Sequence, residues 1–371
     1  MIEFKLPSLG ADMDEGTLLE WKIHPGDAVK PGQVIAVVDT AKAAIDVECW
    51  HDGTVMQLLI DIGAKVPVGT PIALLLEPGE RAQTARRIPT PPVLTAEENR
   101  SGARPRISPA ARKRAAELGF SLSQLQGHGP HGVVTLEDVE AAARAAPEPD
   151  HNQAMRHTIA AAMSRSKREI PHYYLSETIA LGKAMAWLQA HNAKSTLQER
   201  LLPSALLLKA VGLALRDYPQ LNGSWQNNAF EPALDTDLGV AITLRQGGLV
   251  APVLRHVADT ALTDLMSELA SLVERARSGS LRSSELGGAG ITVTQLGEQG
   301  VDSVLGVIYP PQVALVGFGR ICERPWVNEG QLCVMPTVVS SLSADHRVSD
   351  GHYGARFLGE VRRLLQTPEN L

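Results

Sequence analysis

The residues with the clearest capacity for chemistry run from Asp345 to Gly351 and read Asp-His-Arg-Val-Ser-Asp-Gly. The segment before them, 334–343, is rich in β-branched residues and predicts a mostly buried strand. The segment after them, 352–366, has apolar residues at helical spacing. His346 is therefore expected at a strand end, where a rigid element can hold an imidazole toward a cavity. An imidazole titrates near neutral pH, so it can accept a proton and return it.

From the residues alone, this string also has a simpler interpretation. A histidine between an aspartate and an arginine is often a hydrogen-bonded surface residue, and Asp350 is a suitable N-cap for the following helix. The whole string, however, resembles the DHRxxDG motif of the dihydrolipoamide acyltransferases, the core subunits of 2-oxo acid dehydrogenase complexes. This resemblance implies that His346 is the catalytic base and that Asp350 orients the site as well as capping the helix.

Composition limits the classes of function. The chain has 371 residues, enough for two or three domains, and its 44% hydrophobic content is typical of globular proteins. Its net charge of −6 does not indicate nucleic-acid binding, and its three cysteines have neither CxxC nor metal-ligand spacing. The sequence contains neither the roughly 20-residue apolar run of a membrane helix nor a signal-peptide core. We therefore expect a cytoplasmic protein with no metal, disulfide, membrane or nucleic-acid partner.

An internal repeat marks the first domain, residues 1–78. A shift of 37 residues superposes seven identical pairs, including Gly16 on Gly53, Gly26 on Gly63 and Gly32 on Gly69. Each copy predicts two short strands joined by a turn. Two copies predict a small all-β body with quasi-twofold symmetry.

Lys42 lies between the two copies, at the expected tip of a hairpin formed by strands 34–38 and 44–48. A lysine at a turn is usually only a solvated charge, but beside this repeat the stretch resembles a lipoyl domain, whose tip lysine carries lipoate in an amide bond. Biotin carriers of the same fold typically have methionines next to the lysine, so Ala41 and Ala43 favour lipoate. The lipoyl family usually has aspartate where this chain has Ala41.

Residues 79–104 are rich in proline, alanine and arginine, with almost no large apolar residue, and predict a linker. Its ends would lie about 28 Å apart if it were flexible and roughly 80 Å apart if it were extended. Residues 105–142 predict two short helices, the first capped by Ser108 and the second beginning at about Thr135.

This helical segment resembles the peripheral-subunit-binding domain of the same family. In those domains a basic surface binds dihydrolipoamide dehydrogenase or the thiamin-dependent 2-oxo acid dehydrogenase subunit. Arg112 and Arg114 are the matching residues here, with two solvated helix arginines as the alternative interpretation. The family commonly has arginine where this chain has Val133, so one expected contact with a partner differs.

A second linker, 143–152, leads to the last domain, 153–371. Predicted helices over 155–167, 204–217 and 261–278 are interspersed with predicted strands over 238–244, 249–254, 290–296, 313–319 and 334–343. Helices layered on a mixed sheet make an α/β sandwich. Strings such as Ile170-Pro171-His172-Tyr173 resemble the acyltransferase domain, which has a chloramphenicol-acetyltransferase-like fold. The resemblance thus extends over three domains in their usual order.

Moving an acyl group between two thiols requires a base and a donor to the oxyanion. The resemblance assigns the first role to His346, which later returns the proton to the leaving thiol, and the second to Thr294. An ordinary strand threonine is the alternative for Thr294, because threonine favours strands. Thr292 lies on the same face of the predicted strand and is the second candidate.

The family resemblance implies transfer of an acyl group, most commonly acetyl, from S-acyl-dihydrolipoyl-lysine to coenzyme A. Branched-chain acyl transfer, acetoin-derived acetyl transfer and a non-catalytic lipoyl-bearing scaffold remain open. The expected partners are the thiamin-dependent dehydrogenase and dihydrolipoamide dehydrogenase. The family also implies a homotrimer with His346 and Thr294 contributed by different chains. Family members often end in two or more apolar residues, but this chain ends in Leu371 alone, so we expect a stable trimer and leave a 24-subunit core open.

Overall fold

The computed structural model describes residues 1–8, 13, 15–40, 44–77, 107–117, 129, 133–145, 151–244, 248–297 and 300–371. Lys42, its two alanine neighbours and the 79–104 linker lie outside the described residues. Within these ranges, no helix has both the length and the apolar composition needed to cross a membrane.

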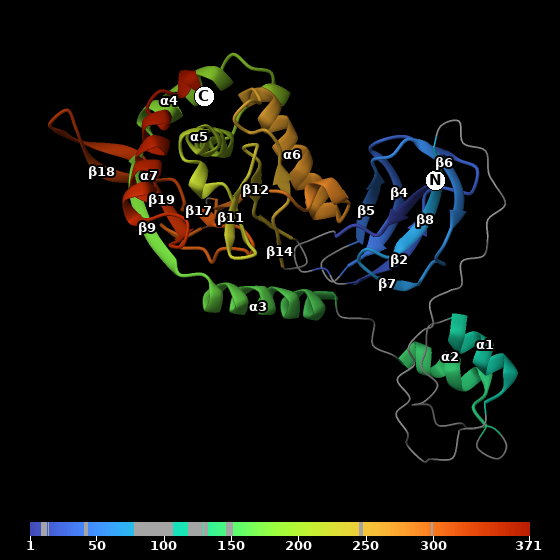
Figure 1. Ribbon diagram of the computed structural model, residues 1–371. Coiled ribbons are helices and arrows are strands. Elements are labelled where there is room, and N and C mark those ends of the chain that lie inside the picture. The colour runs from blue at the N-terminus through green and yellow to red at the C-terminus, as the bar shows by residue number, and fades with distance from the viewer. Residues whose placement is uncertain are drawn as a thin grey trace. The chain divides into compact units, whose positions relative to one another are not determined.

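The N-terminal domain consists of two four-stranded sheets, ordered β1-β8-β6-β3 and β5-β4-β2-β7 (Figure 1). The strands are β1 Ile2–Lys5, β2 Glu15–Trp21, β3 Ala28–Val29, β4 Gln33–Asp39, β5 Ala44–Cys49, β6 Gly53–Leu58, β7 Lys65–Pro67 and β8 Pro71–Leu76. The 37-residue shift superposes β2 on β6, β3 on β7 and β4 on β8, so each repeat supplies equivalent strands to opposite sheets. The predicted all-β body with quasi-twofold symmetry is confirmed.

The repeated glycines have a conformational reason. Gly26 and Gly63 have φ of +100° and +87°, and Gly32 and Gly69 have φ of +80° and +85°. Side chains other than glycine rarely adopt this region, so each repeat needs glycine at both of its turns. The turns return the chain to the core, where the strand residues Ile35 and Ile72 are fully buried.

The helical segment contains α1 Pro109–Glu117 and α2 Leu136–Ala145. The hydroxyl of Ser108 accepts a 3.2 Å hydrogen bond from the N–H of Ala111, as expected of an N-cap. At the second helix, the Thr135 N–H donates to the Asp138 carboxylate at 2.8 Å and the Asp138 N–H donates to the Thr135 hydroxyl at 3.3 Å. Both predicted helix starts are thus correct.

The C-terminal domain has a seven-stranded mixed sheet. Its main path is β15-β12-β16-β17-β19-β18, and β9 pairs with β19 beyond the end of β18. The strands are β9 His172–Ala180, β10 Gly223–Gln226, β11 Ala229–Pro232, β12 Leu238–Val240, β13 Ile242–Thr243, β14 Leu249–Val250, β15 Val253–Leu254, β16 Ile291–Gln295, β17 Ala314–Phe318, β18 Cys322–Asn328 and β19 Gln331–Asp345. The β10–β11 and β13–β14 pairs form separate two-stranded sheets.

The helices of this domain are α3 His151–Glu169, α4 Gly182–Asn192, α5 Pro203–Asp217, α6 Leu262–Ser278 and α7 Gly351–Leu365. Helix α5 is buried almost all round, whereas α7 buries one face that includes Phe357, Val361 and Leu365. Burying each such side chain stabilises the folded state by about 1.5 to 3 kcal/mol. This packing fixes α7 against β9 and β19, and therefore fixes the strand end that precedes α7 (Figure 1).

The predicted α/β sandwich is confirmed, with local differences. The predicted strands 238–244 and 249–254 are each divided in two, and β9, β18 and α4 were not predicted. Strand β18 contains Pro325, which a strand accepts at the edge of a sheet, where β18 lies. Helices α2 and α3 extend into both ends of the predicted 143–152 linker.

Candidate active site

The backbone around His346 is fixed on both sides. Strand β19 ends at Asp345, whose N–H donates to the carbonyl of Val313 at 2.9 Å. The N–H of His346 donates to the carbonyl of Pro171 at 3.0 Å. The next turn closes when the Ser349 N–H donates to the Asp345 carbonyl at 3.1 Å. The predicted strand-end position of His346 is correct, and its residue is exposed.

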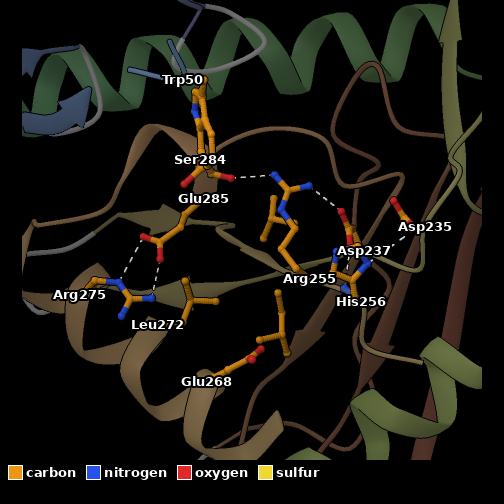
Figure 2. A pocket seen from close by; sticks show the side chains of 12 residues that line it. Trp50, Asp235, Asp237, Arg255, His256, Glu268, Leu272, Arg275, Ser284 and Glu285 are labelled. Atoms are coloured by element: carbon orange, nitrogen blue, oxygen red, sulfur yellow. Dashed lines mark hydrogen bonds and ion pairs between the residues drawn. The ribbon is translucent and has the colours of Figure 1, made fainter. Parts of the chain in front are cut away.

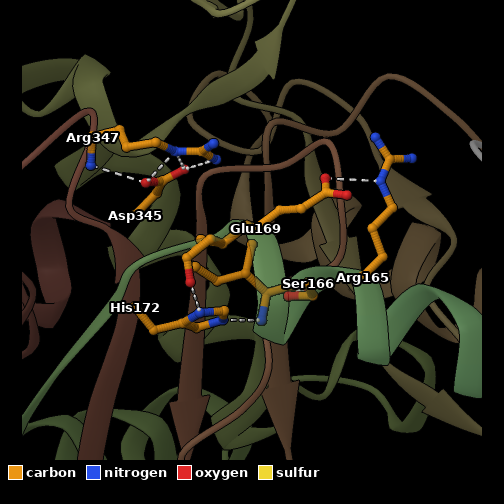
Figure 3. Close-up of polar contacts among 8 residues, drawn as sticks. Arg165, Ser166, Glu169, His172, Asp345 and Arg347 are labelled. Atoms are coloured by element: carbon orange, nitrogen blue, oxygen red, sulfur yellow. Dashed lines mark hydrogen bonds and ion pairs between the residues drawn. The ribbon is translucent and has the colours of Figure 1, made fainter.

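An ion pair inside the motif holds this turn (Figure 3). The Asp345 side chain is fully buried. Nε of Arg347 donates to both of its carboxylate oxygens at 3.0 Å, and Nη2 donates to one of them at 2.6 Å. The Arg347 N–H also donates to this carboxylate, at 2.9 Å. The guanidinium lies 4.6 Å from the ring centroid of Trp225, so it has an aromatic face beneath it as well. Residues on both sides of His346 are therefore tied together.

The imidazole of His346 has an aromatic neighbour. Its ring centroid lies 5.3 Å from that of Tyr173, with 70° between the ring planes. Neither ring nitrogen hydrogen-bonds to any residue that the structure describes. Because the ring is exposed and its nitrogens are not engaged, it can exchange a proton with a substrate.

Asp350 caps the helix that follows the motif. Its carboxylate accepts a 2.9 Å hydrogen bond from the N–H of Tyr353 in the first turn of α7. Of the two aspartates in the motif, Asp345 pairs with Arg347, whereas Asp350 anchors the turn to α7. The capping part of the Asp350 prediction is confirmed.

A pocket of about 520 Å³ adjoins the motif on the Arg347 side. Trp225 forms part of its wall, together with Arg165, Asn227, Asn228 and the Pro310–Pro311 segment. The wall thus combines an aromatic surface, amide side chains, two guanidinium groups and the carboxylate of Glu169, which lies 3.0 Å from Nε of Arg165. This arrangement leaves room for a polar substrate beside the residue that follows His346.

Thr294 and Thr292 differ in what their hydroxyls do. Thr292 is buried, and its hydroxyl donates to the side-chain oxygen of Gln312 at 2.6 Å. Thr294 is half-buried, and its hydroxyl bonds to no side chain or backbone group in the described part of the chain. Of the two candidates, Thr294 is thus the one with a hydroxyl available to a substrate.

Strand register separates Thr294 from His346 within one chain. Thr294 pairs with Gly317 of β17, whereas Ala344, two residues before His346, pairs with Ala314 of the same strand. The two site residues are therefore five positions apart along the sheet, about 16 Å at roughly 3.3 Å per residue. They also lie two strands apart sideways, so their backbones are separated by about 19 Å. The two side chains of one chain cannot meet at one acyl group.

A second polar cluster supports the strand that carries Thr294 (Figure 2). Arg255 follows β15 and donates to the carboxylate of Asp237 at 2.5 Å. Its second terminal nitrogen, Nη2, donates to the carbonyls of Ser284 and Gly287 at 2.7 and 2.9 Å. These bonds fix the segment that leads into β16, and they give Arg255 a structural role.

The remaining predicted residues lie in the other two domains. Lys42 is outside the described residues, but its flanking strands pair as far as Asp39 opposite Ala44, so it belongs to the connection between β4 and β5. Arg112 is exposed on α1, and Arg114 lies 3.7 Å from Glu140 of α2. Among described residues, no group of three or more His, Cys, Asp or Glu side chains has the arrangement of a metal site.

Sequence reasoning missed two features of the site. The bidentate pair of Asp345 and Arg347 lies within the motif itself, and the two-residue spacing beside a strand end was the available signal. Tyr173 lies far from His346 in the sequence, and only the pairing of β9 with β19 brings them together. Nothing in the local sequence indicated that contact.

Three family descriptions match successive parts of the chain. The 2-oxoacid dehydrogenases acyltransferase catalytic domain covers residues 146–371, the biotin-requiring enzyme description covers 2–75, and the e3 binding domain covers 105–140.

Curated relatives match along almost the whole chain. The acetyltransferase component of the pyruvate dehydrogenase complex of Rickettsia bellii is 30% identical, over 99% of this chain and 98% of its own. The lipoamide acyltransferase component of the branched-chain alpha-keto acid dehydrogenase complex of Pseudomonas aeruginosa is 34% identical over the same shares.

Solved structures match the C-terminal domain. A probable dihydrolipoamide acetyltransferase of Listeria monocytogenes is 27% identical with a TM-score of 0.55, covering 60% of this chain and 94% of its own. The dihydrolipoamide acetyltransferase of Azotobacter vinelandii is 29% identical with a TM-score of 0.53, covering 57% of this chain and 88% of its own. The predicted three-part architecture is confirmed, and the chain belongs to the 2-oxoacid dehydrogenase acyltransferase family.

Proposed function

We propose that this chain transfers an acetyl group from S-acetyl-dihydrolipoyl-lysine to coenzyme A, as the core subunit of a pyruvate dehydrogenase complex. The 30% identity to the Rickettsia bellii acetyltransferase over nearly both whole chains supports this substrate class. The observation that carries the chemistry is the exposed imidazole of His346, whose ring nitrogens hydrogen-bond to none of the described residues.

Residue spacing supports the assignment of roles. In the Azotobacter vinelandii enzyme, the roles of one serine, one histidine and one asparagine in catalysis were investigated, and the serine lies 52 positions before the histidine and the asparagine four after it. In this chain Thr294 lies 52 positions before His346, and Asp350 lies four after it. We assign the oxyanion donor to Thr294 and the orienting role to Asp350 on this basis. Both hydroxyls can donate a hydrogen bond, and aspartate keeps the acceptor oxygen of asparagine.

The residues of the site divide the chemistry between them. The lipoyl group supplies the acyl unit as a thioester when it is attached to Lys42. His346 removes the proton from the attacking thiol of coenzyme A and returns it to the thiol that leaves. The hydroxyl of Thr294 donates to the oxyanion that develops on the acyl carbonyl. The ion pair of Asp345 with Arg347 keeps the histidine at the reaction point throughout.

The separation of about 19 Å between Thr294 and His346 requires a second chain in each active site. We propose a homotrimer in which each site takes His346 from one subunit and Thr294 from its neighbour. A solved structure that is 29% identical to this chain is described as the cubic core of the pyruvate dehydrogenase multienzyme complex, which supports assembly of such trimers into a 24-subunit core.

The N-terminal parts serve delivery in this proposal. Residues 1–78 present lipoate on Lys42, and the linker 79–104 lets the carrier reach separate active sites. Residues 105–142 bind dihydrolipoamide dehydrogenase or the thiamin-dependent dehydrogenase through a surface that includes Arg112. We place the complex in the cytoplasm. Because Arg114 already contacts Glu140, its share in partner binding is the smaller one.

Mixing two inactive variants tests the shared site. His346→Ala alone should lower turnover by about two to four orders of magnitude, and Thr294→Val alone by about 10²- to 10³-fold. In trimers assembled from equal amounts of both variants, about one quarter of the sites combine an intact histidine with an intact threonine. Turnover should therefore recover to roughly a quarter of the wild-type value.

A mixture with no more activity than its components would refute the shared site. Thr292→Val is the matched control, because its hydroxyl is bound to Gln312 and should not be needed for turnover. A His346→Ala chain that keeps wild-type turnover would refute the proposed function itself.

A second acyl group has specific support. The branched-chain lipoamide acyltransferase of Pseudomonas aeruginosa is 34% identical over 99% of this chain, a higher identity than that of the Rickettsia bellii acetyltransferase. Turnover measured with acetyl- and isobutyryl-dihydrolipoamide at equal concentrations separates the two. A preference for isobutyryl would move this chain to the branched-chain class and leave the roles of His346 and Thr294 unchanged.

A further inference from the structure

We propose that Tyr173, acting with Ser349, is a positioning residue that sets the orientation of the His346 imidazole. This inference rests on the proposed function, because it matters only if His346 is the base. The supporting observations are the contacts of the tyrosine ring and of its hydroxyl, which reach two different parts of the same turn.

The ring of Tyr173 contacts the imidazole directly. Strand β9 pairs with β19 so that Tyr173 lies opposite Ala344, and its ring centroid lies 5.3 Å from that of His346. The angle of 70° between the planes gives a T-shaped contact, a geometry that aromatic rings favour. Since no described residue hydrogen-bonds to the imidazole nitrogens, this contact is the interaction that can select its rotamer.

The hydroxyl of Tyr173 is held at the other end of the turn. It lies 2.8 Å from Oγ of Ser349, a residue with 8% exposure whose N–H donates to the carbonyl of Asp345. Burial raises the pKa of the Tyr173 hydroxyl above its ordinary value, so it remains protonated and able to donate at neutral pH. One side chain thus spans the turn from its imidazole to its closing residue.

Helix α7 leaves space for this hydroxyl. A Cβ at Gly354 would lie 2.9 Å from the Tyr173 oxygen and 2.8 Å from a methyl of Leu342. Glycine at this buried position therefore lets α7 approach β9 closely enough to hold the tyrosine. Three elements fix the ring: the backbone of β9, the hydroxyl of Ser349 and the surface of α7.

Loss of this positioning should lower turnover without weakening substrate binding. A displacement of about 1 Å at a reacting group can cost up to roughly a hundredfold in rate. We expect Tyr173→Leu to lower kcat about tenfold, because the ring is lost. Tyr173→Phe keeps the ring and loses the hydroxyl, so its kcat should fall only about two- to fourfold.

The test uses the full-length assembled enzyme and measures kcat and KM for coenzyme A with acetyl-dihydrolipoamide in excess. Ser349→Ala should match Tyr173→Phe, and the double variant should be no slower than either, because both changes remove the same hydrogen bond. KM and the assembly mass should remain at their wild-type values in every variant. Tyr174→Phe is the matched control, since Tyr174 is the next residue of the same strand and its hydroxyl contacts Lys167.

Wild-type kcat in both Tyr173→Phe and Ser349→Ala would overturn the inference, as would losses confined to KM. If Tyr173→Leu does not fold, the phenylalanine and alanine variants carry the test alone. A failure of the proposed function can be distinguished, because His346→Ala would then remain active. If Tyr173→Phe and Ser349→Ala keep the wild-type kcat while His346→Ala is inactive, only the positioning role is overturned.

Discussion

Two histidines, His172 and His346, lie close together at the end of β19 and differ in how their ring nitrogens are used. His172 begins β9 and pairs with Asp345, the residue immediately before His346. Nδ1 of His172 donates to the carbonyl of Ile170 at 2.9 Å, and its Nε2 accepts from the N–H of Ile308 at 3.1 Å (Figure 3). His346 is exposed, and the described residues leave both of its ring nitrogens without a hydrogen bond. A histidine that does chemistry needs a nitrogen that the fold has not used, and of these two only His346 has one.

The backbone accounts for this difference. His172 is the half-buried first residue of β9, and both of its ring nitrogens are used, one by the carbonyl of Ile170 and the other by the N–H of Ile308. His346 is one residue beyond the end of β19, where no neighbouring strand among the described residues continues. Its main chain is held by Pro171 and by the ion pair of Asp345 with Arg347, while its side chain stays available. A catalytic histidine needs a main chain that is held in place and a ring nitrogen that can still contact the substrate.

The same substitution at both histidines gives the largest expected contrast. His346→Gln should lower turnover by about two to four orders of magnitude and leave the urea midpoint almost unchanged. His172→Gln should keep turnover within about threefold, because glutamine can donate to Ile170 and accept from Ile308 in place of the imidazole. Turnover and urea unfolding of both variants decide the matter. A His172→Gln enzyme that is stable but as slow as His346→Gln would remove the distinction.

Removing the carboxylate between the two histidines should mainly affect stability. Asp345→Ala leaves the Arg347 guanidinium without its buried partner and frees the turn. Breaking a fully buried pair costs about 3 to 5 kcal/mol. The arginine side chain is 28% exposed, so we expect about 2 to 3 kcal/mol here. Urea unfolding measures this, and Asp302→Ala is the control, because its ion pairs with Arg320 and Arg324 are exposed and should contribute little to stability.

Alanine substitutions at two glycines of α7 distinguish the effect of close packing from the effect of helix propensity. Gly354→Ala places a Cβ against Tyr173 and Leu342, and this overpacking should cost about 1 to 3 kcal/mol. A Cβ at Gly359 would meet no atom within 4 Å, so Gly359→Ala should stabilise the chain by about 0.4 to 1 kcal/mol. Thermal unfolding compares the pair. Equal shifts in the same direction would show that close contact with β9 is not what requires glycine at 354.

Several of these features could be predicted from the sequence because their causes are local. The repeated glycines mark turns that need positive φ, and β-branched residues before Asp345 mark the strand that presents His346. Helix α4 was not predicted because its N-cap residue, Leu181, provides no side-chain cap, and β18 was not predicted because it contains Pro325. The contact of Tyr173 with His346 depends on strand pairing across most of the domain, which no local pattern encodes.

The smallest expected effect is a pH dependence of stability that comes from His172. Burial lowers the pKa of His172 below its ordinary value of 6.5, and the hydrogen bond to Ile170 offsets only part of this. The unfolded chain therefore binds a proton at a higher pH than the folded chain does. The contribution of the neutral imidazole is fully present above pH 6.5 and is lost as the pH falls through the lowered pKa of the folded state. Urea midpoints measured from about pH 7.5 to about pH 5 should fall more steeply for the wild type than for His172→Gln, whose side chain makes the same bonds and does not titrate. Parallel slopes would mean that protonation of His172 does not oppose folding.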